Sequence, residues 1–230
     1  MKRVASAVAQ DYLKLIWLAR EWQRDEPVTT TMLAVKLGVS PSTASEAVKR
    51  LAERGLVRHV PYAAVELTAD GERLALAMVR RHRLLEAFLV ETLGYAWDEA
   101  HDDAEVLEHA ASDRFIAALD TFLGAPSRDP HGDPIPLDDG SVVHPVASAL
   151  SQAPTGTVAI IERISDADPA MLRYFASVGL VPAAPVSVLE RRDFAGVIAL
   201  AVGPDARLVE LGEIAAGAIW VSVVPGSRTP

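Results

Sequence analysis

Residues 29–55, TTTMLAVKLGVSPSTASEAVKRLAERG, contain two predicted helices separated by a turn of three residues. The first helix covers about 29–37 and opens with threonines that can cap its free N–H groups. The turn contains Gly38, and the second helix covers 40–55 and is closed by Gly55. This order of helix, short turn and helix is the pattern of a helix-turn-helix.

The second helix of the pair has a composition that suits contact with DNA. Small polar residues open it, and this end of such a helix enters the major groove. The basic residues that follow could bind phosphates. The predicted DNA-binding residues are Ser40, Ser42, Thr43, Ser45, Glu46, Lys49, Arg50 and Arg58. The spacing leaves open a second interpretation, a helical hairpin without a nucleic-acid role, because Ser and Thr are also good helix caps.

The sequence on either side extends this DNA-binding segment. A helix is expected over residues 5–24, and LVRHVPYAAVELT, residues 56–68, alternates like two short strands around a turn. Such a strand pair would form the wing of a winged helix. Residues 1–60 hold ten Lys and Arg against six Asp and Glu, although the whole chain has a net charge of −9. The net positive charge is therefore found in the segment that would meet DNA.

The composition limits the class of protein. The chain has 230 residues, of which 50% are hydrophobic, so a sizeable core is possible. The absence of cysteine excludes disulfides, thiolate metal sites and cysteine nucleophiles. No apolar run approaches the roughly 20 residues of a membrane span, and the N-terminus lacks the pattern of a secretory signal. A cytoplasmic protein is therefore expected.

Two further helices are expected over residues 69–94 and 98–123. The second contains HDDAEVLEH, residues 101–109, with two histidines and four carboxylates. At about 100° per residue, Asp102 and Asp103 are expected to face water. The other four possible ligands fall on one arc about 100° wide: His101, Glu105, Glu108 and His109.

The preceding helix adds His82 and Glu86, one turn apart. A helical histidine or an acidic run taken alone is more often a packed or solvated residue. Two neighbouring helices that together carry six such groups would be costly to bury without a cation, so we predict a divalent-cation site. A carboxylate–histidine metalloenzyme is the competing interpretation. It is disfavoured because paired Glu-x-x-His motifs, a His-Glu-x-x-His motif and a Gly-rich phosphate loop are all absent.

The amino-acid composition of the sequence changes after residue 123. Residues 124–156 contain six prolines, which indicates a linker or an extended crossing segment. Short β-rich runs follow, interrupted by a helix over 168–179. Several strands in the remaining residues suggest a small barrel. The predicted fold class is therefore α+β.

The ordered set of motifs resembles the diphtheria toxin repressor family of metal-dependent transcriptional regulators. The resemblance covers essentially the whole chain and rests on the helix-turn-helix, VRRHRLLEAFL (79–89), HDDAEVLEHAASD (101–113), DPHGDPIP (129–136) and the β-rich tail. It implies a winged helix-turn-helix DNA-binding domain at 1–75 and an all-helical metal-binding and dimerisation domain at 76–140. A linker at 141–154 and an SH3-like (FeoA-like) β-barrel at 155–225 would follow.

The resemblance also implies two metal sites per subunit. The site nearer the DNA-binding domain would use Asp11, Glu105, Glu108 and His109. The other would use His82, Glu86 and His101, to which the SH3-like domain of long family members adds ligands. Asp168 is the best match for one of these, whereas the next candidate falls on Met171, a poor ligand for a hard cation.

The ligand chemistry favours the manganese-responsive branch of that family. Iron-responsive members have sulfur ligands where this chain has Asp11 and Glu105, and carboxylates favour the harder Mn2+ over Fe2+ or Ni2+. Lys14 stands where some manganese-responsive members carry a carboxylate, which favours two separated sites over a tightly coupled pair.

The function implied is a Mn2+-dependent repressor, not an enzyme, that binds a palindromic operator in double-stranded DNA as a homodimer and controls manganese homeostasis. An Fe2+-dependent repressor of iron uptake with the same architecture is the alternative. Co2+, Ni2+, Zn2+ or Cd2+ could substitute for the physiological ion. Neither a membrane nor a small organic substrate is expected as a partner.

Overall fold

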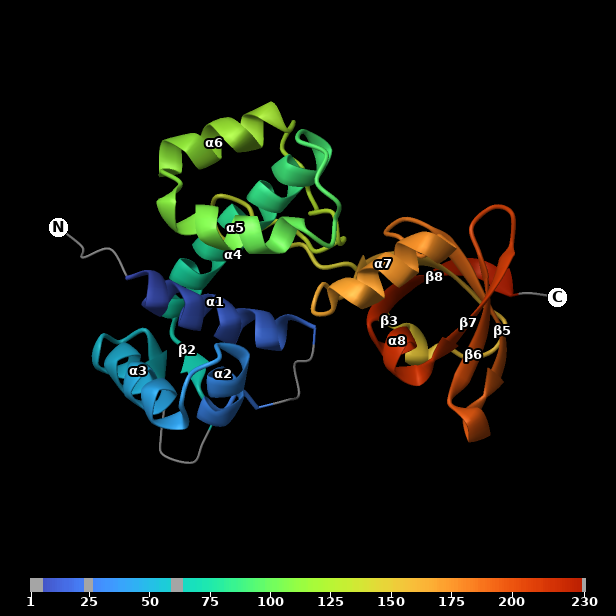
Figure 1. Cartoon of the computed structure of the whole chain (residues 1–230), viewed down its shortest axis with the longest axis horizontal. Coiled ribbons are helices and arrows are strands. Elements are labelled where there is room, and N and C mark those ends of the chain that lie inside the picture. The colour runs from blue at the N-terminus through green and yellow to red at the C-terminus, as the bar shows by residue number, and fades with distance from the viewer. Residues whose placement is uncertain (1–5, 23–26, 59–63, 229–230) are drawn as a thin grey trace. The chain divides into compact units, whose positions relative to one another are not determined.

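The computed structural model describes residues 6–22, 27–58 and 64–228, with side chains as far as residue 224. The chain divides into two compact units, whose helices and strands are drawn in Figure 1. The first comprises residues 1–82 with 136–141, and the second comprises residues 83–135 with 142–230. The division falls inside one continuous helix, α4 (Ala69–Glu91), just after His82.

The first unit contains the helix-turn-helix and its strand pair. Its helices are α1 (Ala7–Glu21), α2 (Thr30–Lys36) and α3 (Pro41–Glu53). Each begins where a hydroxyl oxygen accepts a backbone N–H, at Ser6, Thr29 and Ser40 respectively. Strand β1 (Val57–Arg58) pairs antiparallel with β2 (Glu66–Leu67), as predicted. Residues 59–63 of the predicted turn, and residues 5, 23 and 24 of the predicted first helix, lie outside the described residues.

One apolar core holds these elements together. Leu13 and Ile16 of α1, Leu33 of α2 and Val48 of α3 are fully excluded from solvent. Because each helix directs its apolar face inward, the polar face of α3 stays exposed. The helix predicted to bind DNA therefore packs on the core with its apolar face and exposes its polar face to solvent.

The helical part of the second unit contains the end of α4 together with α5 (Ala100–Ala110) and α6 (Asp113–Phe122). The single helix predicted over 98–123 is wrong. The backbone of Ala111 is extended, with φ −66° and ψ 127°, and the Ser112 hydroxyl accepts the N–H of Phe115 at 3.2 Å. This cap starts a second helix in a new direction.

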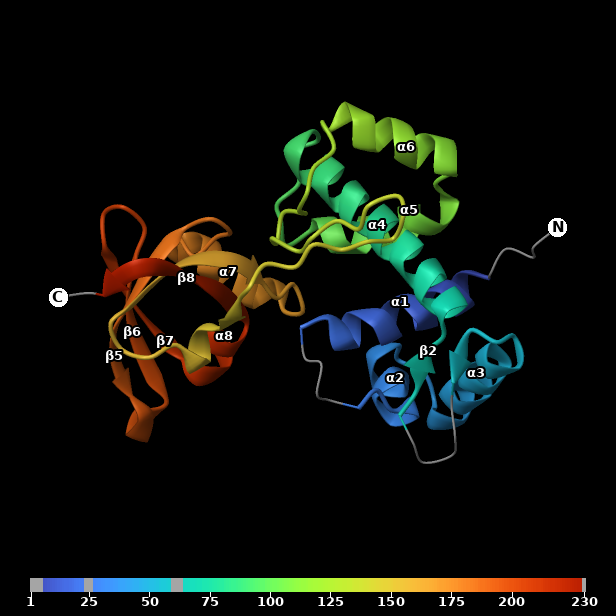
Figure 2. The same ribbon diagram turned by 180° about the vertical axis from the view of Figure 1, so that it is seen from behind.

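The β-rich part of the second unit is one sheet of six antiparallel strands in the order β3-β8-β4-β5-β6-β7. Figure 2 labels β5, β6, β7 and β8 of this sheet together with the helices beside it. Helices α7 (Pro169–Val178) and α8 (Glu213–Gly217) contribute to its core through Phe175 and Ala216. Two short 3-10 turns, η1 (Leu150–Gln152) and η2 (Asp193–Ala195), complete it. The strands are β3 (Ser148–Ala149), β4 (Thr157–Ile164), β5 (Pro185–Arg192), β6 (Val197–Val202), β7 (Arg207–Gly212) and β8 (Ile219–Arg228).

The predicted SH3-like arrangement of strands is present, and its sheet is not closed within the described residues. Strands β3 and β7 form the two edges of the sheet, and the pairs in the described part of the chain do not join them. The domain is an open SH3-like sheet with the predicted order of strands and helix.

The two parts of the second unit are joined by ion pairs and apolar packing. Arg163 of β4 lies 2.6 Å from Asp133, and Arg128 lies 2.6 Å from Glu162. Trp97, from the segment between α4 and α5, packs against the core of the β-rich part. Across the described residues, no helix combines the length and apolar character needed to cross a membrane.

Gly71 allows the start of α4 to lie against the strand pair. A Cβ at this position would overlap the carbonyl oxygen of Leu56. We expect Gly71→Ala to lower the free energy of unfolding by about 2–3 kcal/mol, because rigid backbone must move to admit the methyl group. Chemical denaturation measures this change. Gly212→Ala, where nothing lies within 4 Å, is the control and should change stability little; equal effects of both substitutions would contradict the packing explanation.

Candidate metal centre

Helix α5 presents its possible ligands on one face. Glu108 is fully buried, whereas His101, Glu105 and His109 are partly buried. Asp102 and Asp103 are exposed, as their positions on the helix predicted. His109 Nε2 lies 3.6 Å from Glu108 Oε1, so adjacent residues place an imidazole beside a buried carboxylate.

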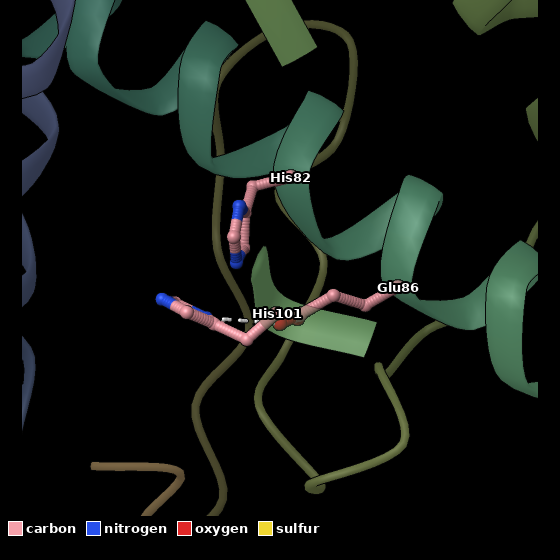
Figure 3. Close-up of side chains that lie close together, drawn as sticks. All are labelled: His82, Glu86 and His101. Atoms are coloured by element: carbon pink, nitrogen blue, oxygen red, sulfur yellow. Dashed lines mark hydrogen bonds and ion pairs between the residues drawn. The ribbon is translucent and has the colours of Figure 1, made fainter. Parts of the chain in front are cut away.

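His82 and Glu86 of α4 point toward His101 of α5 (Figure 3). His101 Nδ1 lies 3.3 Å from Glu86 Oε1, and one ligand atom from each of the three residues lies within 4.8 Å of the others. Glu86 is only 1% exposed. Two imidazoles around a buried carboxylate form a donor set suited to a divalent cation.

His82 is also close to the other ligands of α5. Ligand atoms of His82, Glu105 and Glu108 lie within 4.8 Å of one another. His101 Nε2 is 3.7 Å from Glu105 Oε1. The two predicted sites are therefore not clearly separated in the structure. His82 and His101 each lie near Glu86, which was assigned to one site, and near Glu105, which was assigned to the other.

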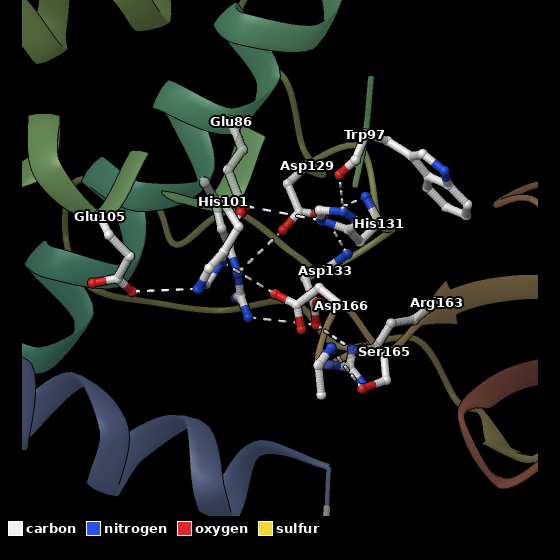
Figure 4. A network of polar contacts seen from close by, with 12 residues as sticks. Glu86, Trp97, His101, Glu105, Asp129, His131, Asp133, Arg163, Ser165 and Asp166 are labelled. Carbon is white, nitrogen blue, oxygen red and sulfur yellow. Dashed lines mark hydrogen bonds and ion pairs between the residues drawn. The ribbon is translucent and has the colours of Figure 1, made fainter. Parts of the chain in front are cut away.

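A third group contains residues that the sequence analysis missed. Glu86, His131 and Asp166 bring ligand atoms within 4.8 Å of one another (Figure 4). His131 Nδ1 lies 4.0 Å from Glu86 Oε2, and His101 Nδ1 lies 3.7 Å from Asp166 Oδ2. Glu86 therefore belongs to two groups of possible ligands, one with His82 and His101 and one with His131 and Asp166.

The hydrogen bonding of His131 leaves one nitrogen available. Its Nε2 lies 2.8 Å from the carbonyl oxygen of Trp97, and because a carbonyl only accepts, Nε2 carries the proton and donates. The ring also stacks on Trp97, with centroids 5.7 Å apart. Nδ1 is buried without a hydrogen-bond partner. A lone pair held in this way beside carboxylates is what a cation would bind.

The surrounding carboxylates are crowded. Burial, together with the charges of Asp133 and Glu86, raises the pKa of Asp129 to about 8. Burial lowers the pKa of His131, but the carboxylates of Asp129, Glu86 and Asp166 and the Trp97 carbonyl outweigh this effect and leave it above its usual value. Burial is the larger cause for Asp129, whereas neighbouring carboxylates decide the direction of the pKa shift for His131. A divalent cation would offset the negative charge that contributes to both.

Asp168 lies elsewhere. It is exposed, and its Oδ1 accepts the N–H groups of Ala170 and Met171 at 2.8 and 3.2 Å, which caps α7. The geometry therefore favours Asp166, two residues earlier, as the carboxylate contributed by the β-rich part. The sequence signal for Asp166 and His131 was present in the dense carboxylate and imidazole content of DPHGDP and SDADP, but the prolines suggested a linker and a cap instead.

The predicted DNA-binding residues all lie on the outside of the first unit. Ser40, Ser42, Thr43, Ser45, Glu46, Lys49, Arg50 and Arg58 are exposed. Glu46 Oε1 accepts from Arg50 Nε at 3.1 Å, so the carboxylate is partly neutralised before any contact with a base. Ser40 Oγ lies 2.8 Å from both Ser42 Oγ and Thr43 Oγ1. Asp11 lies on α1, partly buried, next to the buried Tyr12.

A helix-turn-helix followed by helices with convergent carboxylates and imidazoles defines a metal-responsive DNA-binding protein. Three protein-family models match the chain in the same order. Residues 5–65 match the N-terminal DNA-binding domain of iron-dependent repressors, and residues 68–137 match their metal-binding and dimerisation domain. Residues 149–223 match the FeoA domain. The chain belongs to the iron-dependent repressor family, which includes the diphtheria toxin repressor.

Individual relatives agree with this assignment. The chain is 34% identical over 169 residues to the iron-dependent repressor IdeR of Mycobacterium leprae, covering 68% of this chain and 73% of that protein. It is 58% identical to a manganese-dependent transcriptional repressor solved in complex with manganese, with a TM-score of 0.90, covering 94% of this chain and all of that one. ScaR solved with bound Cd2+ is 32% identical, with a TM-score of 0.80, and covers 94% of this chain and 99% of that one.

Substitution of Asp166 and of Asp168, two aspartates on the same segment, should distinguish a metal ligand from a helix cap. We expect Asp166→Ala to weaken Mn2+ binding by at least about tenfold with little loss of stability, because its carboxylate faces Glu86 and His131. Asp168→Ala should cost about 1 kcal/mol through loss of the α7 cap and leave Mn2+ binding unchanged. Equilibrium Mn2+ titration and thermal unfolding provide the two readouts, and the reverse pattern would restore Asp168 as the ligand.

Proposed function

We propose that this chain is a Mn2+-dependent transcriptional repressor of the cytoplasm that binds a palindromic operator as a homodimer and controls manganese homeostasis. The observation that carries this proposal is the donor set. The candidate ligand groups that contain Glu86 or Glu108 consist of carboxylates and imidazoles, and the chain has no cysteine. Oxygen and imidazole donors suit Mn2+ better than they suit ions that prefer thiolate ligands. The 58% identical repressor solved with manganese supports the same ion.

We assign two cation sites to each subunit. One would use Asp11 of α1 with Glu105, Glu108 and His109 of α5. The other would be built around Glu86, with His82 and His101, or with His131 and Asp166, as its imidazole and carboxylate partners. The burial of Glu86 and Glu108 supports both assignments, because a buried carboxylate needs a positive partner.

The proposed switch works through repulsion among carboxylates. Without a cation, Asp11, Glu105 and Glu108 repel one another, so α1 has no fixed attachment to the dimerisation region. With a cation bound, the same side chains hold α1 in place and set the spacing of the two recognition helices. Only a pair about 34 Å apart enters successive major grooves of a palindrome. By linkage, operator DNA must raise the affinity for the cation by the same factor.

An exposed apolar surface supports the homodimer. Val106 and Leu107 of α5 and Phe115 and Phe122 of α6 are large apolar side chains with high exposure, 72% at Val106 and 67% at Phe122. A second copy of the same helices would cover them. The match of residues 68–137 to a metal-binding and dimerisation domain points to the same surface.

An Fe2+-dependent repressor of iron uptake is the second candidate, favoured by the relation to the iron-dependent repressor of Mycobacterium leprae. The two candidates share DNA binding and differ in the activating ion. Operator binding measured with Mn2+, with Fe2+ and with chelator separates them. Activation by Fe2+ at lower concentration than Mn2+ would favour the iron repressor, and equal binding in chelator would exclude both.

Glu108→Ala tests the metal-dependent step. We expect it to weaken Mn2+-dependent operator binding by at least about tenfold, since loss of a direct ligand should exceed the effect of losing an outer-shell partner. Gel-shift titrations with Mn2+ and with chelator measure the effect. Asp102→Ala, on the exposed side of the same helix, is the matched control and should behave like the wild type. Unchanged Mn2+ dependence in Glu108→Ala would refute the ligand assignment.

Lys49→Ala tests the DNA-binding surface. Lys49 is exposed on α3, and its proposed role is to neutralise a phosphate. We expect Lys49→Ala to weaken binding to all DNA sequences equally. The slope of log affinity against log salt concentration should become shallower by about 1. Arg73→Ala, which removes an exposed cation from the start of α4, is the control. A change in sequence preference at constant salt slope would mean that Lys49 contacts a base instead.

A further inference from the structure

Arg83 of α4 is a buried cation that none of the proposed sites uses. It is only 3% exposed and lies between the proposed ligands His82 and Glu86 in the sequence. Its Nη1 donates to the carbonyl oxygen of Pro134 at 2.7 Å. Its Nε lies 3.5 Å from Asp129 Oδ2, and its Nη2 lies 3.4 Å from Asp133 Oδ1. One guanidinium therefore contacts residues 129–134, here named the His131 turn, at three points.

The His131 turn is closed by its own hydrogen bonds. Asp129 Oδ1 accepts the backbone N–H groups of His131 and Asp133, each at 2.9 Å. The N–H of Gly132 donates to the carbonyl oxygen of Asp129 at 3.1 Å. Figure 4 shows Asp129, His131 and Asp133 gathered beside Glu86. The carboxylate that receives Arg83 on one oxygen thus holds the backbone of His131 with the other.

The far side of the turn is fixed by β4. The carbonyl oxygen of His131 accepts the N–H of Ile164 at 2.9 Å, and Arg163 Nε lies 2.6 Å from Asp133 Oδ1. Gly132 has φ +90°, and a Cβ there would overlap the carbonyl oxygen of Glu162. On the α4 side, Arg83 provides the corresponding attachment. His131 therefore sits at the tip of a turn that is held from two directions.

We infer that Arg83 is a positioning residue for the cation site, holding Asp129 so that the imidazole of His131 faces Glu86. This inference rests on the proposed role of His131 as a ligand. Arg83 contacts the ligand through Asp129 and does not itself bind the cation. A planar guanidinium suits this role because its five N–H groups form a fixed fork that reaches two carboxylates and a carbonyl together. A lysine ammonium keeps the charge but lacks the fork.

The test measures Mn2+ binding to the full chain by the electron paramagnetic resonance signal of free Mn2+. The measurements use a Glu108→Ala background, which removes the proposed Asp11 site and leaves the site around Glu86. Arg83→Met should lower the affinity of that site about tenfold, as loss of an outer-shell partner does. Arg80→Met is the matched control. Arg80 lies on the same helix and binds the next stretch of the same segment, at Pro136 and Asp138, so its loss should leave the affinity unchanged.

A double-mutant cycle distinguishes positioning from a general effect on folding. Combined with His131→Ala, Arg83→Met should cause no further loss of Mn2+ affinity. An equal further loss would overturn the inference, and so would wild-type affinity in Arg83→Met alone. If His131→Ala alone leaves Mn2+ binding intact, the proposed ligand role of His131 fails instead. If circular dichroism shows that Arg83→Met does not fold, Arg83→Lys is used instead. It should cause a smaller loss of Mn2+ affinity, and no further loss when combined with His131→Ala. Wild-type affinity in Arg83→Lys would then overturn the inference.

Discussion

The carboxylate of Glu86 is 1% exposed and faces His82, His101 and His131, drawn from α4, α5 and the turn before the sheet. An ionised carboxylate in such a place is stable only with a positive partner, which a neutral imidazole does not supply. The elements around it converge on a point of negative charge. Helix–helix packing and the attachment of the β-rich part both bring donors to Glu86, so the proposed cation site depends on both.

The sequence predicted the parts of this arrangement that follow from local periodicity. The helices at 29–37 and 40–55, the threonine cap of the first, and the common face of His101, Glu105, Glu108 and His109 depend only on the local sequence of one helix. Confirmation of these features was therefore to be expected. The family resemblance added Asp11, which no spacing rule would have selected, and its role as a ligand stays a prediction.

The features that the sequence did not predict depend on contacts between distant residues. The break at Ala111 was hidden because Ser112 and Asp113 continue a plausible helical pattern, and only the cap geometry reveals the new start. The prolines around His131 predict a linker, and nothing local indicates that the carbonyl oxygen of His131 accepts the N–H of Ile164, 33 positions later. The order of the strands in the sheet, in which β8 lies between β3 and β4, likewise depends on pairing between distant segments.

The β-rich part contributes structure to the cation site as well as a possible ligand. Arg163 of β4 both pairs with Asp133 of the His131 turn and lies over the ring of Trp220, 4.5 Å from its centroid. Trp97 stacks on His131 while packing against the core of the sheet. A change that loosens the sheet from the helices would therefore move His131 and Asp166 together, away from Glu86. If the cation site around Glu86 is as proposed, cation affinity there and docking of the β-rich part are linked, because His131 is held partly by β4 and Asp166 belongs to the β-rich part.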